Sequence, residues 1–229
     1  MAARRIHYDV KRAATSTSLP SHGIYYIPCE ENILKGTALL IGREGTPYYG
    51  GFYFFSVEFP DEYPFVPPKV LSLTQDGRTR FNPNMYINGK VCLSILNTWH
   101  DGPQWSGVLT IESVLLSIMS DVLNRNPLEN EPMYAGCGMT PEAQTYSRSV
   151  WHANVRTAIL ENLTHPPSWA RPFLKIMTSE FLKIKPALLT LCAEASVHDG
   201  KTETTRVFSM ACTYDFAGLY RRLVDSSGV

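Results

Sequence analysis

The chain of 229 residues is long enough for one domain of ordinary size with a smaller extension, or for one large domain. A hydrophobic fraction of 44%, with ten Phe and twelve Tyr, argues against disorder over most of this length, because such a chain can bury a sizeable core. Lys plus Arg number 21, as do Asp plus Glu, so the net charge of zero supplies no overall field for binding nucleic acid or an acidic membrane.

The cysteines favour a reducing compartment. All five lie far apart, at positions 29, 92, 137, 192 and 212, and none belongs to a CxxC pair, which argues against a disulfide scaffold and a zinc ribbon. No apolar run is long enough to cross a bilayer, and the first residues lack the apolar core of a secretory signal. We therefore expect a monomer of the cytoplasm or nucleus that uses no cofactor and no metal, and binds neither nucleic acid nor a membrane.

The first half of the chain predicts a short helix followed by strands. Residues 4–14 suit an amphipathic helix, since Ile6, Val10 and Ala13 recur on one side. Gly and Pro then separate runs typical of strands, at residues 23–28, 37–42, 50–60 and 68–74. In the third run, alternation from Tyr53 to Phe59 predicts one buried face. The short connections favour an antiparallel meander.

A proline-rich loop joins the last two of these strands. Four prolines fall within residues 60–69, so this segment can form neither a helix nor a regular ladder. Phe65 lies inside the loop. It either fills the local core or stands exposed as a contact for another protein.

The second half predicts helices. Residues 110–124 form a strong amphipathic pattern with Thr110 placed as its cap. Beyond about Thr140 no strand alternation is visible, and helices are expected from Pro141, over 171–184 between Pro172 and Pro186, over 186–195 and over 216–223, with a polar loop at 198–205. The fold class is therefore α+β: an antiparallel sheet meander framed by helices over residues 1–138, and an all-helical extension over 139–229.

Residues 81–96 hold the cysteine of greatest interest. Cys92 lies between Val91 and Leu93 as a core residue would, but Asn82, Pro83 and Asn84 precede it in a turn. A nucleophilic cysteine acting on a carbonyl needs a donor for the developing oxyanion, and the amide of Asn84 can be that donor. Two alternatives remain open from these residues, a purely structural turn and a buried inert thiol.

Three stretches taken together resemble one family. Residues 81–93 (FNPNMYINGKVCL) are similar to the active-site segment of the ubiquitin-conjugating enzymes, residues 46–70 to their strand pair and proline-rich loop, and residues 105–127 to their central helix and the Asn-Pro that follows. The likeness covers residues 4–138 in the family's order. Asn82 in place of the family's usual His, together with KVCLSILNTW and NEP, resembles the Z-type members, and the helical extension is more like the Z type than like the giant apoptosis-inhibitor member.

The resemblance implies the fold of this family and a carrier chemistry on Cys92. That thiol would receive ubiquitin or a ubiquitin-like modifier as a thioester from an activating enzyme, and pass it to a lysine amine, usually with a ligase. Asn84 would steady the oxyanion, and Asn82 would organise the loop. Glu129 falls at about the family's acidic gate, where it is equally consistent with a solvated loop residue. Ser94 stands where many relatives carry Asp.

The resemblance also implies partner surfaces. Phe65, Trp105 and Ser106 fall at positions that contact ligases in the family. Arg4 and Arg5 fall on the helix face that docks on the activating enzyme, although a basic helix face is also commonly just solvated. The Z type further suggests use of the non-standard ubiquitin-activating enzyme. Two other classes stay open, a non-catalytic binding module with the same fold and a cysteine peptidase, for which no nearby His partner is visible.

Overall fold

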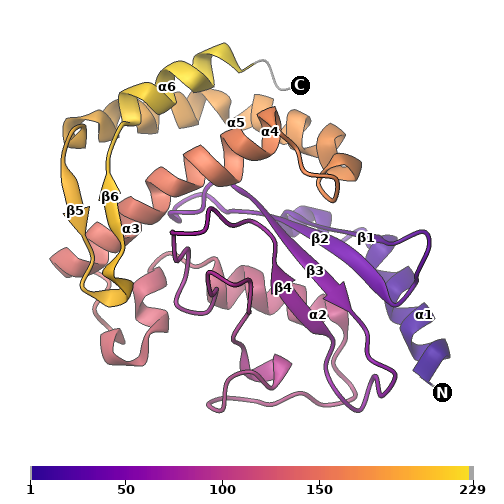
Figure 1. The fold of residues 1–229 in the computed structure, drawn as a ribbon. Helices are drawn as coiled ribbons and strands as arrows, with labels where there is room; N and C mark the ends of the chain where they lie inside the picture. The colour runs from indigo at the N-terminus through magenta and orange to yellow at the C-terminus, as the bar shows by residue number, and fades with distance from the viewer. Residues whose placement is uncertain (1, 227–229) are drawn as a thin grey trace.

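The computed structural model describes residues 2–226. The strands are β1 (Ile24–Pro28), β2 (Lys35–Ile41), β3 (Phe52–Glu58), β4 (Lys69–Ser72), β5 (Thr202–Thr204) and β6 (Ala211–Thr213). The α-helices are α1 (Ala2–Ala14), α2 (Ile111–Ser117), α3 (Pro141–Ala153), α4 (Asn162–Thr164), α5 (Leu174–Ala195) and α6 (Phe216–Asp225). Figure 1 shows the arrangement of these elements.

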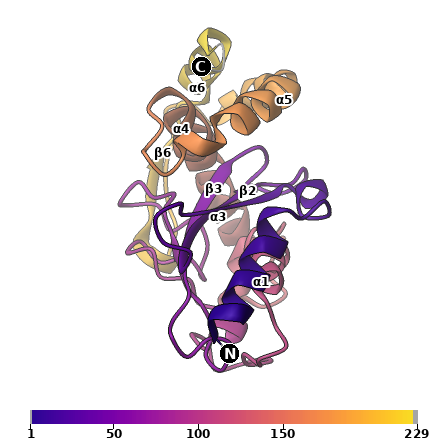
Figure 2. The same ribbon diagram turned by 90° about the vertical axis from the view of Figure 1, so that its right-hand side faces the viewer.

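The first four strands form one antiparallel sheet in chain order, β1-β2-β3-β4, as the short connections predict. Ala38 of β2 lies opposite Phe55 of β3 in this register. The meander of the predicted fold class is thereby confirmed. Figure 2 shows α1 on one side of the sheet and the helices α5 and α6 on the other.

One face of the sheet packs against α1 and α2. Tyr53, Phe55 and Val57 of β3 are buried there, as their alternation predicts. Helix α2 begins as expected, since the amide of Ser113 donates to Oγ1 of Thr110 at 3.4 Å. The helix continues as a π-helix over Ile118–Val122, and Val122 is buried in the same core.

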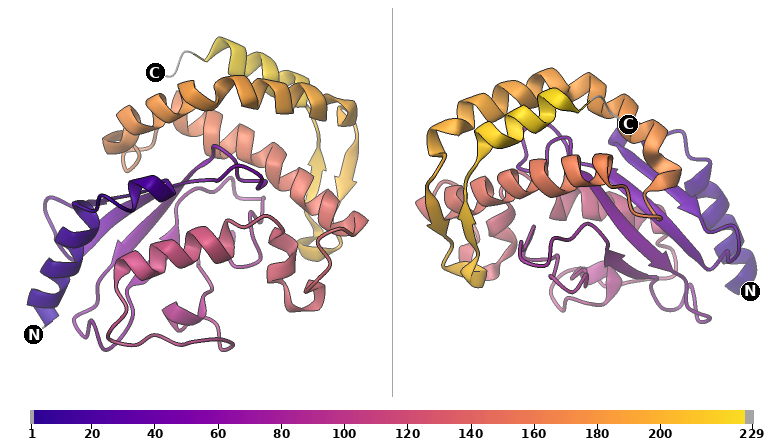
Figure 3. Two further views of the ribbon diagram at one scale, coloured as in Figure 1. Left: turned by 180° about the vertical axis from the view of Figure 1, so that it is seen from behind. Right: turned by 45° about the horizontal axis from the view of Figure 1, so that its top comes forward.

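The opposite face of the sheet is covered by the C-terminal extension. Phe52 and Phe54 of β3 and Leu39 of β2 are fully buried in a second core, formed with the helices that follow residue 154. Strand β3 is thus buried on both faces, whereas its alternation predicted one buried face. Figure 3 shows α3 between the sheet and the outer helices α5 and α6.

Buried amides join the extension to the sheet. Nδ2 of Asn162 donates to the Phe52 carbonyl at 2.9 Å, and Oδ1 of Asn154 accepts from the Tyr53 hydroxyl at 2.7 Å. A Cβ added at Gly51 would lie 1.9 Å from this Asn154 oxygen, so the close approach requires glycine. The extension therefore packs on the sheet of the first part of the chain, a point that the sequence left undecided.

Two predictions for the extension are wrong in detail. Pro186 does not end a helix, because α5 continues through it to Ala195. Proline removes one backbone donor, yet Phe181 and Leu188 on either side are fully buried, and this packing keeps the helix continuous. The extension is also not all-helical, since the segment read as a polar loop forms β5, which pairs with β6. The final helix is confirmed as α6.

Within residues 2–226, no helix combines the length and the apolarity that crossing a bilayer requires.

Candidate active site around Cys92

The segment before Cys92 folds back so that a turn lies beside the thiol. Isolated bridges join Asn82 to Met85 and Met85 to Val91, and the Cys92 amide donates to the Asn84 carbonyl at 2.8 Å. Cys92 is 3% exposed, and its Sγ donates to the carbonyl of Thr98 at 2.8 Å. The thiol is therefore almost fully buried and is hydrogen-bonded to one backbone carbonyl.

Asn84 lies directly against the cysteine. Its Nδ2 donates to the Cys92 carbonyl at 2.6 Å, and its own carbonyl accepts from the Cys92 amide, so these two residues are joined twice. A side-chain amide carries two N–H groups, and one of them is engaged in this contact. Among the described residues, Oδ1 of Asn84 is buried without a hydrogen-bond partner. The sequence prediction that the chain returns Asn84 to the cysteine is matched by this geometry.

Asn82 organises the same turn from inside the core. It is fully buried, and Nδ2 donates to the hydroxyl of Tyr48 at 3.0 Å and to the Val122 carbonyl at 2.8 Å. Its Oδ1 accepts from the Asn84 amide at 2.8 Å and from Nδ2 of Asn130 at 3.2 Å. Both polar ends of the side chain are therefore engaged, as expected for a residue that shapes a loop.

The Tyr48 phenol completes this contact. Burial raises its pKa, so the hydroxyl stays protonated and can donate to the Phe81 carbonyl at 2.8 Å while it accepts from Asn82. The turn that carries Asn82 and Asn84 is thereby tied to the loop before β3.

Thr98 is a site residue that the sequence analysis missed. Its Oγ1 accepts from the Leu93 amide at 2.9 Å and lies within hydrogen-bonding distance of the Val91 and Leu93 carbonyls, at 2.9 and 3.1 Å. Thr98 also accepts from the Cys92 thiol through its backbone carbonyl. It therefore contacts the cysteine and the backbone on both sides of it. No motif or periodicity in the sequence marked Thr98 for this role.

Glu129 is engaged by its own loop. Its Oε1 accepts from the Gly138 amide at 2.8 Å and faces Nδ2 of Asn126 at 3.4 Å, and the side chain is half-buried. These contacts support a structural part for this carboxylate in shaping the segment that leads to α3. Ser94 is also half-buried, on the first turn after the cysteine.

The proline-rich loop presents its aromatic residue to solvent. Phe65 is 81% exposed, so of its two readings the exposed one describes the structure. Trp105 is buried, and its Nε1 donates to the Pro64 carbonyl at 2.8 Å, which fixes the neighbouring loop against this one. Ser106 is exposed, and with Phe65 and the 83%-exposed Val108 it leaves surface available to another protein.

The two N-terminal arginines differ in their surroundings. Arg4 is exposed. Arg5 is half-buried, pairs with Asp9 at 2.7 Å, and donates to the carbonyls of Gly107 and Leu109, both at 2.8 Å. Arg5 therefore anchors α1 to the Trp105 loop, which leaves Arg4 as the freer of the two for a partner.

Within residues 2–226, no three His, Cys, Asp or Glu side chains gather as a metal site would require.

Comparisons with known proteins agree with this architecture. The sequence model of the ubiquitin-conjugating enzyme family matches residues 5–157. Ubiquitin-conjugating enzyme E2 Z of Danio rerio is 35% identical over 205 residues, and that of Homo sapiens 34%, covering 89% of this chain in each case. The chain spans 62% and 57% of the length of these two relatives.

Two further likenesses come from a larger relative and a solved structure. The dual E2 ubiquitin-conjugating enzyme/E3 ubiquitin-protein ligase BIRC6 of Mus musculus is 36% identical over 201 residues, which is 84% of this chain and 4% of that protein. The E2 domain of a Toxoplasma gondii ubiquitin conjugating enzyme superposes with a TM-score of 0.52 at 23% identity, over 69% of this chain and 99% of its own, and so supports the fold. Family match and fold together establish that this chain belongs to the ubiquitin-conjugating enzymes, and its similarity to the E2 Z relatives supports the likeness to the Z type.

Proposed function

We propose that this chain carries ubiquitin or a ubiquitin-like modifier as a thioester on Cys92. The Cys92 thiolate attacks the thioester carbonyl that links the modifier's C-terminal glycine to the activating enzyme, whose thiol departs. A lysine amine then attacks the new thioester, an isopeptide bond forms, and the Cys92 thiol is released with a proton from the amine. Both steps pass through a tetrahedral oxyanion.

The observation that carries this proposal is the double contact between Asn84 and Cys92. It brings a side-chain amide next to the cysteine that follows the Asn82–Asn84 turn, and within residues 2–226 the thiol of this cysteine is hydrogen-bonded to the Thr98 carbonyl alone. Asn84 has a second amide hydrogen with which it can donate to the oxyanion, once the modifier is attached. Asn82 acts behind it by fixing the turn.

Glu129 and Ser94 bear on how the incoming lysine loses its proton. The incoming lysine must lose its proton, since its ordinary pKa is about 10.4. A carboxylate near the entrance would help, but Glu129 Oε1 is engaged by the Gly138 amide, which favours a structural role. Ser94, without a charge, offers no alternative base.

The partners are also proposed. Exposed Phe65, Ser106 and Val108 supply an apolar contact for a ligase, and exposed Arg4 a charged one for the activating enzyme. The Z-type likeness favours the non-standard activating enzyme, and the extension would influence that choice. We place the activity in the cytoplasm or the nucleus, where the Cys92 thiol stays reduced.

The charging reaction tests the proposal. Purified protein is incubated with ubiquitin, ATP and each of the two ubiquitin-activating enzymes in turn, and adducts are resolved with and without thiol. We expect a reducible adduct, a thiol-resistant oxyester with Cys92→Ser and no adduct with Cys92→Ala. A thiol-sensitive adduct on Cys92→Ala would refute the assignment of Cys92.

The same reaction separates the alternative function. A non-catalytic binding module of this fold would bind ubiquitin or a ligase but form no adduct with either activating enzyme. The Cys92 surroundings described above favour the enzyme over the module. A peptidase would release cleaved products instead of an adduct.

A further inference from the structure

Arg80 holds the turn that carries the two site asparagines. Its Nε donates to the Asn82 carbonyl at 3.2 Å, and its Nη2 donates to the Pro83 carbonyl at 2.7 Å. A planar guanidinium that donates to two neighbouring carbonyls fixes both direction and distance. The orientation of the Arg80 side chain therefore influences the position of the Asn82 and Pro83 backbone.

Two aromatic rings contact the Arg80 guanidinium. Its Cζ lies 3.7 Å from the ring centroid of Tyr86, which belongs to the same turn, and 4.5 Å from that of Phe208. Both distances are within the range at which a cation is attracted to an aromatic face. Phe208 lies in residues 205–210, the tip of the hairpin formed by β5 and β6, which we call the hairpin tip.

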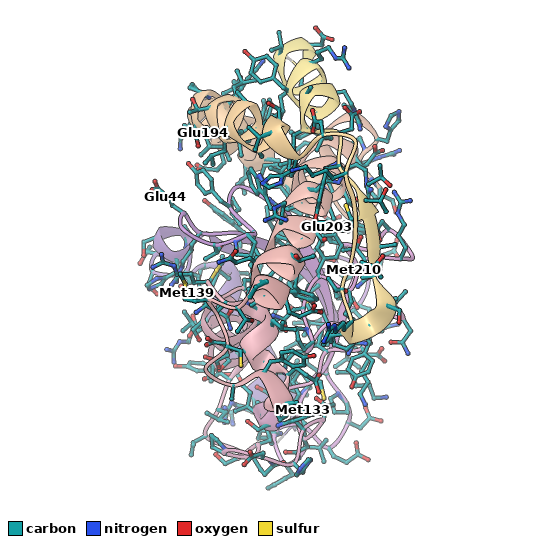
Figure 4. All side chains as sticks on the ribbon, turned by 90° about the vertical axis from the view of Figure 1, so that its left-hand side faces the viewer. Glu44, Met133, Met139, Glu194, Glu203 and Met210 are labelled. Atoms are coloured by element: carbon teal, nitrogen blue, oxygen red, sulfur yellow. The ribbon has the colours of Figure 1, made fainter. Side chains whose placement is uncertain are left out.

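The hairpin tip thus contacts the catalytic segment directly from the far end of the chain. Tyr146 of α3 strengthens this contact, because its hydroxyl donates to the Arg80 carbonyl at 2.6 Å and its ring lies 6.2 Å from that of Phe208. Buried Met210 belongs to the same core as Val91 and Leu93. Figure 4 shows Met210 and Glu203 on the hairpin where it runs alongside α3.

The backbone of the hairpin tip is unfavourable by itself. Phe208 has a φ of 62° and Ser209 a φ of 47°, a left-handed region that bulky residues avoid. Contacts with neighbouring residues hold the backbone of Phe208 and Ser209 in this region. Oγ1 of the fully buried Thr205 donates to the Val207 carbonyl at 2.6 Å, and the Glu142 carboxylate accepts from the Arg206 amide at 2.6 Å. Strained backbone that its surroundings over-determine is typical of positions with a functional task.

We propose that Phe208 is a positioning residue for the active site, acting through Arg80 on the turn that carries Asn82 and Asn84. The stack keeps the guanidinium in the plane from which it donates to the turn, and the turn keeps Asn84 against Cys92. The C-terminal extension thereby sets the rate at which charged Cys92 passes its cargo to an amine. The effect on the discharge rate rests on the proposed function, whereas the effect of Phe208 on the turn rests on geometry alone.

The test uses substitutions at Phe208 in the full-length chain. Phe208→Leu keeps an apolar side chain of similar reach but has no aromatic face for Arg80, and Phe208→Tyr restores the face. The matched control is Tyr220→Ala on α6, because Tyr220 and Phe208 are both 37% exposed aromatic residues of the extension. Melting temperatures establish that each variant is folded at the assay temperature.

The first readout is structural and needs no activity. Hydrogen exchange of the peptide covering residues 81–93 reports the amides of Asn84 and Cys92, which are bonded within the turn. We expect faster hydrogen exchange in Phe208→Leu, and exchange at the wild-type rate in both Phe208→Tyr and Tyr220→Ala. Unchanged exchange in Phe208→Leu would overturn the proposal, whether or not the protein charges with ubiquitin.

The second readout is single-turnover discharge of charged Cys92 onto free lysine over a range of lysine concentrations. A shift of about 1 Å in a catalytic group costs roughly 100-fold in rate, so a partly loosened turn should slow the maximal rate of Phe208→Leu several-fold. The half-saturating lysine concentration should be unchanged, and Phe208→Tyr should recover the rate. Because Phe208 acts through Arg80, adding Phe208→Leu to Arg80→Lys should cost nothing more.

The outcomes separate this inference from the proposed function. A wild-type chain that never charges refutes the proposed function, and hydrogen exchange alone then decides whether Phe208 positions the turn. If the wild-type chain charges, two results would each refute the positioning role. One is discharge of Phe208→Leu at the wild-type rate, and the other is losses of rate at Arg80 and Phe208 that add up in the double variant.

Discussion

Replacing Asn82 by alanine should be among the most damaging single changes in the active-site segment. The side chain is fully buried and takes part in four hydrogen bonds, two through Nδ2 and two through Oδ1. Two of its partners keep another bond, since the Tyr48 hydroxyl still donates to Phe81 and Nδ2 of Asn130 still donates to Asp121. The Asn84 amide and the Val122 carbonyl lose the partner that Asn82 supplies.

The size of the loss follows from these two groups. A buried donor or acceptor left without a partner costs about 1–3 kcal/mol, so two give roughly 4 kcal/mol for Asn82→Ala. Asn88 provides the control, because it lies in the same segment but is exposed, and its Oδ1 only accepts from the Lys90 amide at 3.1 Å. Asn88→Ala should cost less than about 1 kcal/mol, as is usual for surface substitutions.

Urea unfolding at pH 7, followed by tryptophan fluorescence and circular dichroism, measures both changes. Coincident transitions would justify a two-state free energy for each protein. If Asn82→Ala loses no more free energy of unfolding than Asn88→Ala, the argument that this buried amide holds the turn is refuted. If it loses the expected amount, any fall in activity must be measured at a temperature where the variant remains folded.

Four further predictions concern other parts of the site and the extension. Phe65→Ala should leave charging of Cys92 intact and weaken ligase-stimulated transfer, because the ring is exposed; equal loss of both would indicate a packing role. Asn84→Ala should slow discharge onto lysine by up to about 2.7–4 kcal/mol of barrier, as loss of one oxyanion donor does, and normal discharge by a folded variant would exclude that role. Thr98→Val should change the rate at which iodoacetamide alkylates Cys92 and lower stability by about 1–2 kcal/mol, while Thr98→Ser should match wild type in both assays. Burial, with the nearby Arg156 charge, lowers the pKa of His152 to about 4, whereas in the unfolded chain this pKa is near 6.5, so the unfolded chain binds the proton more readily. The His152 contribution to the free energy of unfolding should therefore be complete above pH 6.5 and be lost as the pH falls towards 4, and His152→Gln should flatten this pH dependence in urea unfolding curves.

Local patterns were sufficient for much of the fold. Strands β1 to β4 and helices α1, α2 and α6 could be predicted because period-two and helical alternation report which side chains are buried, and Gly, Pro and Thr110 mark the ends. The turn before Cys92 was readable for the same reason, since Asn and Gly favour backbone conformations that a strand does not. The family likeness then assigned chemistry to that turn.

Other features depended on contacts that only the folded chain makes. The outer side of β3 is buried because the extension covers Phe52 and Phe54, and α5 passes through Pro186 because packing on either side outweighs one lost backbone bond. The short strands β5 and β6 carry too few residues for their alternation to show, and their contact with α3, where Arg148 pairs with Glu203, exists only in the folded chain.

The sequence by itself determined that Cys92 lies in a built turn, because the residues that form the turn are its neighbours in the chain. Tertiary structure alone decided what holds that turn. Thr98 and Arg80 flank the segment in the chain, but their hydrogen bonds to it appear only in the folded structure, and Phe208 comes to Arg80 from the far end of the chain. Local propensity reports only on residues close in sequence, whereas the groups that stabilise this site are brought together by burial of two cores on opposite faces of one sheet.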